Sequence, residues 1–376
     1  MAQAINNGFP ICFTGGGTGG HVIPGLAVIE QIQKKFDVNV IWIGSGKGIE
    51  KKLISDAGIR FAAIPAGKLR RYFSLRNLID MFKVVAGIVR SWFILKKCKP
   101  LVVFSKGGYV TVPPVIAAGF LKIPVVTHES DFDPGLATRI ASGRAAKICV
   151  SYPQTADYFH AAVKSKIVVT GNPVRSAILS GDPKQGKQAV GCPSSLPLVF
   201  VLGGSLGSKA VNTLVDGIKE NCKDTLFIVH QRGAGNPDTS GRVYPHVFTR
   251  DFFYSELPHI LAASSLVISR AGANTLWELA AAQKPSILVP LVAGSRGDQV
   301  RNAAVFEKIG AARVLDEKTA TPQQLLEIIR DCVDNKEKLK AMSTAAGSIF
   351  KPEAASRIAE VIMNCAQERK TAADGN

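Results

Sequence analysis

A dense run of glycines followed by a histidine is the first segment of this chain that could do chemistry. The run ICFTGGGTGGH places Gly15, Gly17 and Gly20 in the spacing G-x-G-x-x-G, directly before His21. A glycine loop that leads from a strand into a helix offers backbone N–H groups and the positive end of the helix dipole to an anion, or lets a sugar approach the backbone closely. Taken alone, the same spacing also occurs in tight turns that bind nothing.

His21 is the candidate proton acceptor of this loop. We expect it in the first turn of a helix, where the dipole lowers the pKa of the ring and keeps the imidazole neutral. The neutral form suits a general base, although a histidine that packs against or caps the turn fits the position equally well. A nicotinamide site is disfavoured, because the second strand, VNVIWIG, ends in Gly44 and Ser45 instead of the acidic residue that holds a ribose.

Further polar residues follow later apolar runs. The run LVFVL leads into a second glycine loop, GGSLGS, in which Ser205 and backbone amides would cradle a phosphate. Arg175 in GNPVR could reach a diphosphate, and the carboxylate of Glu278 could accept hydrogen bonds from both hydroxyls of a ribose. Gln299 follows the strand SILVP, where an amide suits sugar hydroxyls. A surface arginine and a solvated helical glutamate are the ordinary alternatives.

Metal and disulfide chemistry have little support in the sequence. His128, Glu129, Asp131 and Asp133 in THESDFDPG imitate a metal-ligand cluster, but Pro and Gly follow at once and mark a turn, so we expect no metal. The sequence has neither GxxxxGK[ST] nor HExxH. Its seven cysteines are odd in number and lack metal-ligand spacing, which favours a reducing cytosol.

The pattern of elements predicts the scaffold that carries these residues. Short β-branched runs alternate with longer amphipathic stretches, which is typical of an α/β fold with parallel sheets. The predicted strands are 10–13, 38–43, 101–104, 124–127, 146–150, 167–170, 198–202, 225–230, 266–269 and 286–290. Because each half opens with a strand that runs into a glycine loop, we predict two Rossmann-like domains that face a central ligand cleft. The expected boundaries are 1–175, a linker at 176–196, 197–350, and a final helix and tail at 351–376.

Composition and charge limit the class of protein and its partners. The chain has 376 residues, of which 46% are hydrophobic, so two domains with their own cores are expected. Its net charge is +17, and residues 1–180 carry 23 basic and 9 acidic side chains, whereas 181–376 carry 23 and 20. No segment of twenty residues is apolar enough to cross a bilayer, and no basic region precedes the first apolar run, so we expect no secretory signal.

Much of the excess charge lies in the segment 68–99, which contains nine basic residues and a single acid, Asp80. Aromatic and aliphatic residues lie between the basic ones. This combination describes a surface that binds an anionic membrane. A helix that turns its apolar side to the core, or a surface that binds nucleic acid, would show a similar pattern.

Seven segments stand in a fixed order along the chain. They are GGGTGGHVIPGLAV at 15–28, SKGGYVTVPPVIAA at 105–118, THESDFDPGLATR at 127–139, GNPVR at 171–175, GGSLGSKAVN at 203–212, SRAGANTLWELAAAQKPSILVP at 269–290 and GDQVRNA at 297–303. Together they closely resemble the MurG family of bacterial glycosyltransferases, from about residue 9 to 350.

The resemblance implies the GT-B fold and a defined reaction. N-acetylglucosamine would pass from UDP-N-acetylglucosamine to the 4-hydroxyl of the muramyl sugar of lipid I, an undecaprenyl-diphosphate-linked muramyl peptide, to form lipid II for peptidoglycan synthesis. It implies neither cofactor nor metal, and a peripheral position on the cytoplasmic face of the plasma membrane.

The matching motifs imply a role for each site residue. Thr18, Gly19 and Gly20 would lie beside the donor sugar, with His21 as the base. Arg175 and Ser205 would hold the donor diphosphate, and the backbone near Tyr254 would contact the uracil. The segment that would wrap the nucleotide, with Glu278 on the ribose, is Ala273, Asn274, Thr275, Leu276, Trp277 and Glu278. Gln299 would bind the hydroxyls of N-acetylglucosamine.

Two positions depart from the family pattern. The usual HEQN is HESD here, so Asp131 stands where an asparagine commonly meets the donor sugar. Leu206 replaces a frequent glutamine in the second glycine loop. The main alternative is a soluble enzyme that resembles UDP-N-acetylglucosamine 2-epimerase, which gives no reason for the segment 68–99. A nucleic-acid-binding protein would leave both glycine loops unused, so we expect no nucleic acid partner.

Overall fold

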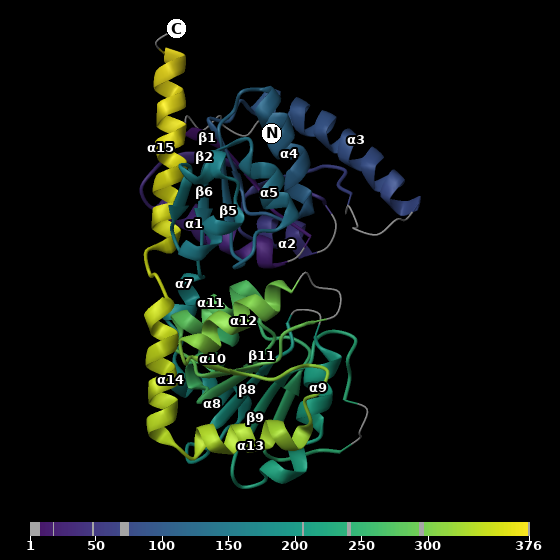
Figure 1. Cartoon of the computed structure of the whole chain (residues 1–376), viewed down its shortest axis with the longest axis vertical. Helices are drawn as coiled ribbons and strands as arrows, with labels where there is room; N and C mark the ends of the chain where they lie inside the picture. The colour runs from purple at the N-terminus through teal and green to yellow at the C-terminus, as the bar shows by residue number, and fades with distance from the viewer. Residues whose placement is uncertain are drawn as a thin grey trace. The chain divides into compact units, whose positions relative to one another are not determined.

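The computed structural model describes residues 8–17, 19–46, 49–67, 75–204, 207–238, 242–292 and 297–374. Thr18, Ser205 and Leu206 therefore lie outside the described residues. The chain divides into two compact units (Figure 1). Unit 1 comprises Met1–Val174 and Lys351–Asn376, and unit 2 comprises Arg175–Phe350.

Unit 1 is built on a parallel sheet of seven strands in the order β3-β2-β1-β4-β5-β6-β7. The strands are β1 (Phe9–Thr14), β2 (Val38–Gly44), β3 (Arg60–Ala63), β4 (Val102–Ser105), β5 (Val125–Glu129), β6 (Ala145–Val150) and β7 (Ile167–Val169). The helices are α1 (Ile23–Gln33), α2 (Ile49–Asp56), α3 (Leu75–Cys98), α4 (Val112–Phe120), α5 (Leu136–Ser142), α6 (Ala161–Lys164) and α15 (Ala354–Asp374). Three short 3₁₀ helices are η1 (Gly19–His21), η2 (Tyr109–Thr111) and η3 (Pro153–Tyr158).

Helices cover both faces of this sheet, which explains why its central strands read as continuous apolar runs. On one face, side chains of β1, β2 and β4 pack with α1 and α15 in a core that includes Phe13, Trp42 and Ile362. On the other face, a second core joins the sheet to α3 and α4 through Leu95 and Val115. The last helix of the chain therefore completes the core of the first unit.

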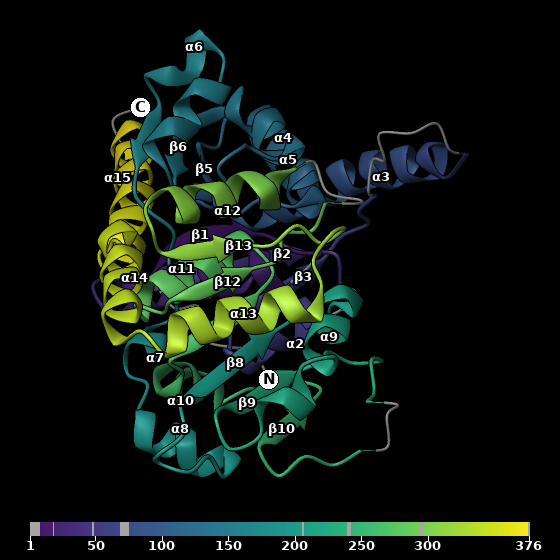
Figure 2. The ribbon, with the colours of Figure 1, turned by 60° about the horizontal axis from the view of Figure 1, so that its bottom comes forward.

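Unit 2 repeats the architecture with a parallel sheet of six strands in the order β10-β9-β8-β11-β12-β13 (Figure 2). The strands are β8 (Leu198–Leu202), β9 (Phe227–Gln231), β10 (Val247–Arg250), β11 (Leu266–Ser269), β12 (Ser286–Leu288) and β13 (Ala312–Val314). The helices are α7 (Ser176–Leu179), α8 (Pro183–Val190), α9 (Lys209–Asp216), η4 (Lys219–Cys222), α10 (Leu257–Ala263), α11 (Ala273–Ala281), α12 (Asp298–Lys308), α13 (Pro322–Val333) and α14 (Lys336–Ile349). Its main core joins the sheet to α9 and α13.

The expected fold class, two Rossmann-like parallel-sheet domains, is confirmed by these two sheets. Every predicted strand is present, with ends shifted by one or two residues. Three short strands were not predicted: β3, β10 and β13. The segment 176–196, expected as a linker, contains α7 and α8, and α8 packs on α10. Among the described residues, no helix has both the length and the apolar character needed to cross a membrane.

Close packing of α1 on the sheet places the first glycine loop. Trp42 of β2 is fully buried, and its indole Nε1 donates a 3.0 Å hydrogen bond to the carbonyl of Gly15. The ring lies against Gly25 of α1, where a Cβ would come within 2.6 Å of its Cη2 atom. The absence of a side chain at Gly25 therefore allows the contact that ties the glycine loop to β2.

We predict that Gly25→Ala destabilises the protein by about 1–3 kcal/mol, because the added methyl overpacks the site against an indole that cannot move away. Urea denaturation followed by tryptophan fluorescence measures the change. Gly143→Ala is the matched control, since Gly143 has a helical φ of −62° and open space around its Cα. That variant should be unchanged or slightly more stable; equal stability of the two variants would contradict the packing argument.

Candidate active site

Both sheets reverse the direction of their strand order at one point, and some of the predicted site residues follow the strands at those points. In unit 1 the reversal falls between β1 and β4, and in unit 2 between β8 and β11. Loops that leave neighbouring strands in opposite directions open a crevice at the carboxyl ends of a parallel sheet, which is where such folds bind ligands. His21 follows β1, and the start of α11 follows β11.

His21 lies in the 3₁₀ turn η1 and not in the first turn of α1, as the sequence predicted. The loop after β4 forms a wall against its ring. A Cβ on Gly108 would lie 2.9 Å from the ring atom Cδ2, and one on Gly107 would lie 3.8 Å from Nδ1. Both glycines have φ between 84° and 90°, which side chains rarely allow. The Ser-Lys-Gly-Gly sequence therefore brings bare backbone against the imidazole.

The pKa of His21 is lowered to about 4, first by burial and second by the positive charge of Lys106. The expected direction of this shift is confirmed, but its main cause is not the helix dipole. Above pH 4 the ring is neutral and one nitrogen is available to accept a proton. The geometry and the charge state are both those of a candidate general base.

Lys106 is a buried cation that the sequence analysis overlooked. It is only 2% exposed, and its Nζ donates to the hydroxyl of Ser130 at 2.5 Å. Ser130 in turn donates to the side-chain oxygen of Asn172 at 2.7 Å. Burial lowers the pKa of Lys106 to about 8, while Glu129 and Asp131 oppose that shift. The sequence held one signal for it: Lys106 directly follows a buried strand and precedes two glycines. A lysine buried in such a place needs polar partners.

Glu50 is a second buried residue that the sequence analysis missed. Its carboxylate accepts hydrogen bonds from the backbone N–H of Gly17 at 2.8 Å and of Ser45 at 2.5 Å, and from the Ser45 hydroxyl. A Cβ on Gly16 would collide with this carboxylate at 2.0 Å. The acid that follows the second strand thus holds the glycine loop in place, instead of binding a ribose.

The HESD segment organises a turn. Glu129 accepts from the backbone N–H groups of Ser130, Asp131 and Gly135 at 2.8–3.1 Å. His128 is buried, its Nε2 lies 3.0 Å from the carbonyl of Gly171, and burial lowers its pKa. Asp131 itself is half-buried. Among the described residues, no three His, Cys, Asp or Glu side chains gather as a metal-binding group.

In unit 2, Arg175 and Glu278 contact each other directly. Arg175 precedes α7, and its Nε and Nη2 lie 2.9 and 2.8 Å from the same carboxylate oxygen of Glu278 on α11. Burial raises the pKa of Glu278, and the guanidinium of Arg175 partly offsets this. The structure therefore joins two residues that the sequence placed 103 positions apart in the chain.

The other predicted residues of α11 fall into two groups. Leu276 and Trp277 are buried in the core, and Ala273 is buried at the start of the helix. Asn274 and Thr275 are partly exposed. Only the second group, together with Glu278, presents partly exposed side chains at this end of unit 2.

Two further predicted residues, Gln299 and Tyr254, lie elsewhere in unit 2. Gln299, in the first turn of α12, accepts from the backbone N–H of Leu291 at 3.0 Å and so secures the loop after β12. Tyr254 is 69% exposed after β10, with its ring 4.7 Å from that of Phe252. Within the described part of the chain, neither residue forms a hydrogen bond or an ion pair with Arg175 or Glu278.

The second glycine loop is described only at its ends. Gly207 has a φ of 75°, and a Cβ there would lie 2.0 Å from the carbonyl oxygen of Arg232. Ser208 caps α9 by accepting from the N–H of Val211 at 3.3 Å. The N-terminus of α9 is therefore formed tightly against the carboxyl end of β9.

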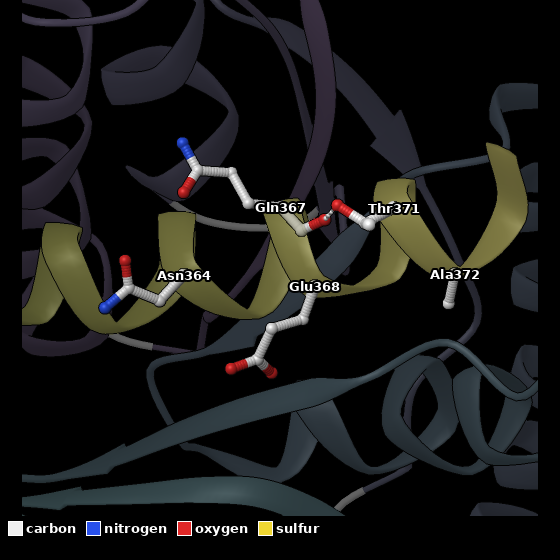
Figure 3. Close-up of a pocket in the computed structure, with 5 residues that line it drawn as sticks. All are labelled: Asn364, Gln367, Glu368, Thr371 and Ala372. Carbon is white, nitrogen blue, oxygen red and sulfur yellow. Dashed lines mark hydrogen bonds between the residues drawn. The ribbon is translucent and has the colours of Figure 1, made fainter. Parts of the chain in front are cut away.

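A hollow of about 640 Å³ lies elsewhere, along the exposed side of α15. Its lining, drawn in Figure 3, consists of Asn364, Gln367, Glu368, Thr371 and Ala372. All five come from one helix, and none is a predicted site residue. The candidate chemistry belongs to the strand ends and not to this hollow.

Two family descriptions match the chain. The glycosyltransferase family 28 N-terminal domain matches residues 11–150, and the family 28 C-terminal domain matches residues 198–360.

Curated relatives are similar along most of the chain. A protein of Treponema denticola is 45% identical, covering 94% of this chain and 96% of its own length. One of Clostridium tetani is 44% identical over 87% of this chain and 91% of its own length. Both are named UDP-N-acetylglucosamine–N-acetylmuramyl-(pentapeptide) pyrophosphoryl-undecaprenol N-acetylglucosamine transferase.

Solved structures share the fold. MurG of Acinetobacter baumannii has a TM-score of 0.73 at 25% identity, covering 95% of this chain and 99% of that one. A UDP-N-acetylglucosamine 2-epimerase of Neisseria meningitidis, solved with UDP-N-acetylglucosamine, has a TM-score of 0.70 at 17% identity with the same coverage. The likeness to the epimerase concerns the fold alone.

Proposed function

This chain belongs to glycosyltransferase family 28, and on that premise we propose that it transfers N-acetylglucosamine from UDP-N-acetylglucosamine to the 4-hydroxyl of the muramyl sugar of lipid I, forming lipid II. The observation that carries the proposal is the 45% identity to a relative named for this transfer. His21 also supports the proposal, because the reaction needs a proton acceptor and the imidazole is neutral and lies against the backbone of Gly108. An epimerase is less supported, since only the fold is shared with one.

The proposed reaction is a single inverting displacement. The 4-hydroxyl oxygen of the acceptor attacks the anomeric carbon of the α-linked donor sugar, and the bond to the UDP oxygen breaks as the β-1,4 bond forms. His21 takes the hydroxyl proton, and UDP leaves with the bonding electron pair. Gly19 and Gly20, with Thr18 and Asp131, would lie beside the donor sugar.

Unit 2 would bind the donor. Arg175 and Ser205 would hold the diphosphate, and the N-termini of α9 and α11 would add positive potential where charge develops on the leaving UDP. Glu278 would accept the ribose hydroxyls, which requires that it exchange part of its contact with Arg175 for the sugar. Tyr254, the α11 segment and Gln299 would complete the nucleotide and sugar contacts. The division into an acceptor domain at 1–175 and a donor domain at 197–350 is part of this proposal.

We predict that His21→Ala lowers kcat for transfer by about 10²–10⁴-fold, because the general base is lost, while the binding of UDP-N-acetylglucosamine changes little. The assay follows radiolabelled sugar from the donor into a soluble lipid I analogue. His160→Ala is the control, since His160 is also in unit 1 but is exposed and only caps α6.

Near-normal kcat in His21→Ala would remove His21 from its role. If the wild-type protein released N-acetylmannosamine and made no disaccharide, the proposed transfer itself would be wrong and the epimerase alternative would take its place.

Unit 1 also carries a surface suited to a membrane. Helix α3 lies at the outer edge of unit 1 and extends away from the sheet in both views (Figures 1 and 2). Phe82, Val85, Val89 and Phe93 recur at helical spacing and are 51–69% exposed. The same helix exposes basic residues, which are Lys83, Arg90, Lys96 and Lys97. Its opposite side packs on α4 through Leu95 and neighbours.

We propose that this surface of α3 attaches the protein to the anionic lipids of the cytoplasmic leaflet, where a lipid-linked acceptor resides. Exposed phenylalanines insert among the acyl chains, and the cations are attracted to the negative surface. The enzyme would then be a peripheral protein on the cytoplasmic face of the plasma membrane.

The double variant Phe82→Ser/Phe93→Ser should bind vesicles of phosphatidylglycerol and phosphatidylcholine at least tenfold more weakly, because each buried phenylalanine contributes about 1.5–3 kcal/mol. Vesicle sedimentation measures the affinity, and turnover of a soluble acceptor should stay unchanged. Leu179→Ser is the control, since Leu179 is a 55% exposed apolar residue of unit 2. Equal losses in both variants, or no loss in the double variant, would exclude α3 as the membrane surface.

A further inference from the structure

We propose that Lys106 is a positioning residue for His21, anchored through Ser130 and Asn172, so that the lysine and the histidine act as one unit. The inference rests on the proposed function, in which His21 is the base. It names a residue to which neither the sequence motifs nor the relatives assign a role.

Lys106 connects the strand ends that surround His21. Lys106 is held at both ends: its backbone N–H donates to the carbonyl of Thr14 at 2.9 Å, and its Nζ donates to Ser130 at 2.5 Å. Thr14 ends β1, Lys106 follows β4, and Ser130 follows β5, so one side chain ties together the carboxyl ends of three neighbouring strands. Gly107 and Gly108, which contact the ring of His21, come next in the chain. A displacement of Lys106 would therefore also displace Gly108, two residues later, which lies beside the imidazole.

The charged groups around Lys106 also bear on the protonation of His21. Two acids flank Ser130 in the sequence and act on Lys106: Glu129 already accepts hydrogen bonds from three backbone N–H groups, and Asp131 is the other. His128 is neutral because burial and Lys106 both lower its pKa. On the other side of the ring's loop, Glu50 is held by Gly17 and Ser45, and burial raises the pKa of the Tyr109 hydroxyl. Lys106 is the cation that acts on His21.

The sign of this effect defines what Lys106 contributes. The cation of Lys106 disfavours imidazolium, whereas the hydrogen bond between its backbone and the ring favours it; with burial, the net result is a ring that is free of a proton before the acceptor binds. A diphosphate-linked acceptor carries charge of the opposite sign. Its arrival would offset the field of Lys106 and raise the basicity of His21 when the hydroxyl proton must be taken.

The test compares Lys106→Met with Ser130→Ala, because the first removes charge and anchor whereas the second removes only the anchor. We expect kcat to fall about 10- to 100-fold in both, since a small displacement of a base is costly. The pKa of His21, followed by NMR titration of its Cε1 proton, should rise above 4 in Lys106→Met but stay below 6.5, because burial, the larger cause of its low value, remains; in Ser130→Ala it should stay low. Lys164→Met removes an exposed lysine of unit 1 and should change neither quantity.

The NMR titration needs no turnover, so the result stands apart from the proposed reaction. If wild-type protein transfers no sugar but Lys106→Met still raises the pKa of His21, the function is wrong and the coupling is right. An unchanged His21 pKa in folded Lys106→Met overturns the proposal. If that variant does not fold, near-normal kcat in Ser130→Ala overturns it, and Lys106→Arg, which keeps the charge, must retain the low pKa of His21.

Discussion

The close approach of bare backbone to the His21 ring is the constraint on which the site in unit 1 depends. Gly108 can lie against the imidazole only because it lacks a side chain, and Gly107 and Gly108 both have the positive φ that favours glycine. The imidazole stays neutral because burial and the nearby cation of Lys106 both lower its pKa. Glu50 and Trp42 hold the opposite loop at the same strand ends, so the sheet, the glycines and the charge state form one arrangement.

Unit 2 uses the same topology with different electrostatics. Its strand order reverses between β8 and β11, as that of unit 1 reverses between β1 and β4. A glycine also allows a close backbone approach here, because a Cβ on Gly207 would collide with the carbonyl oxygen of Arg232. The charged pair here is Arg175 with Glu278, a contact that a diphosphate and a ribose could each replace in part. In the proposed function, one topology thus carries a neutral base in unit 1 and the nucleotide contacts in unit 2.

The sequence predicted what local pattern encodes and missed what only tertiary structure brings together. Buried parallel strands such as β1 and β8 are unbroken apolar runs, whereas β3 and β10 lie at sheet edges, are half exposed, and lack that signal. The low pKa of His21 was expected, but its two causes could not be read from the glycine loop. Burial arises only in the folded protein, and Lys106 lies 85 residues further along the chain. Glu50 was missed because it lies in the first turn of α2, several residues after the end of β2, and only the fold brings it to the glycine loop. Family resemblance indicated Arg175 and Glu278 without their mutual contact.

The pH dependence of kcat/KM for sugar transfer by the wild-type enzyme tests the central claim most directly, because this ratio reports the ionisation of the free enzyme. Protonation of His21 removes the base, so the acidic limb should fall as the pH drops through about 4. Initial rates with a soluble acceptor, taken after brief exposure to each pH, give the profile. An acidic limb centred near 6.5, the ordinary pKa of histidine, would show that neither burial nor Lys106 lowers the pKa of His21, and would contradict the account.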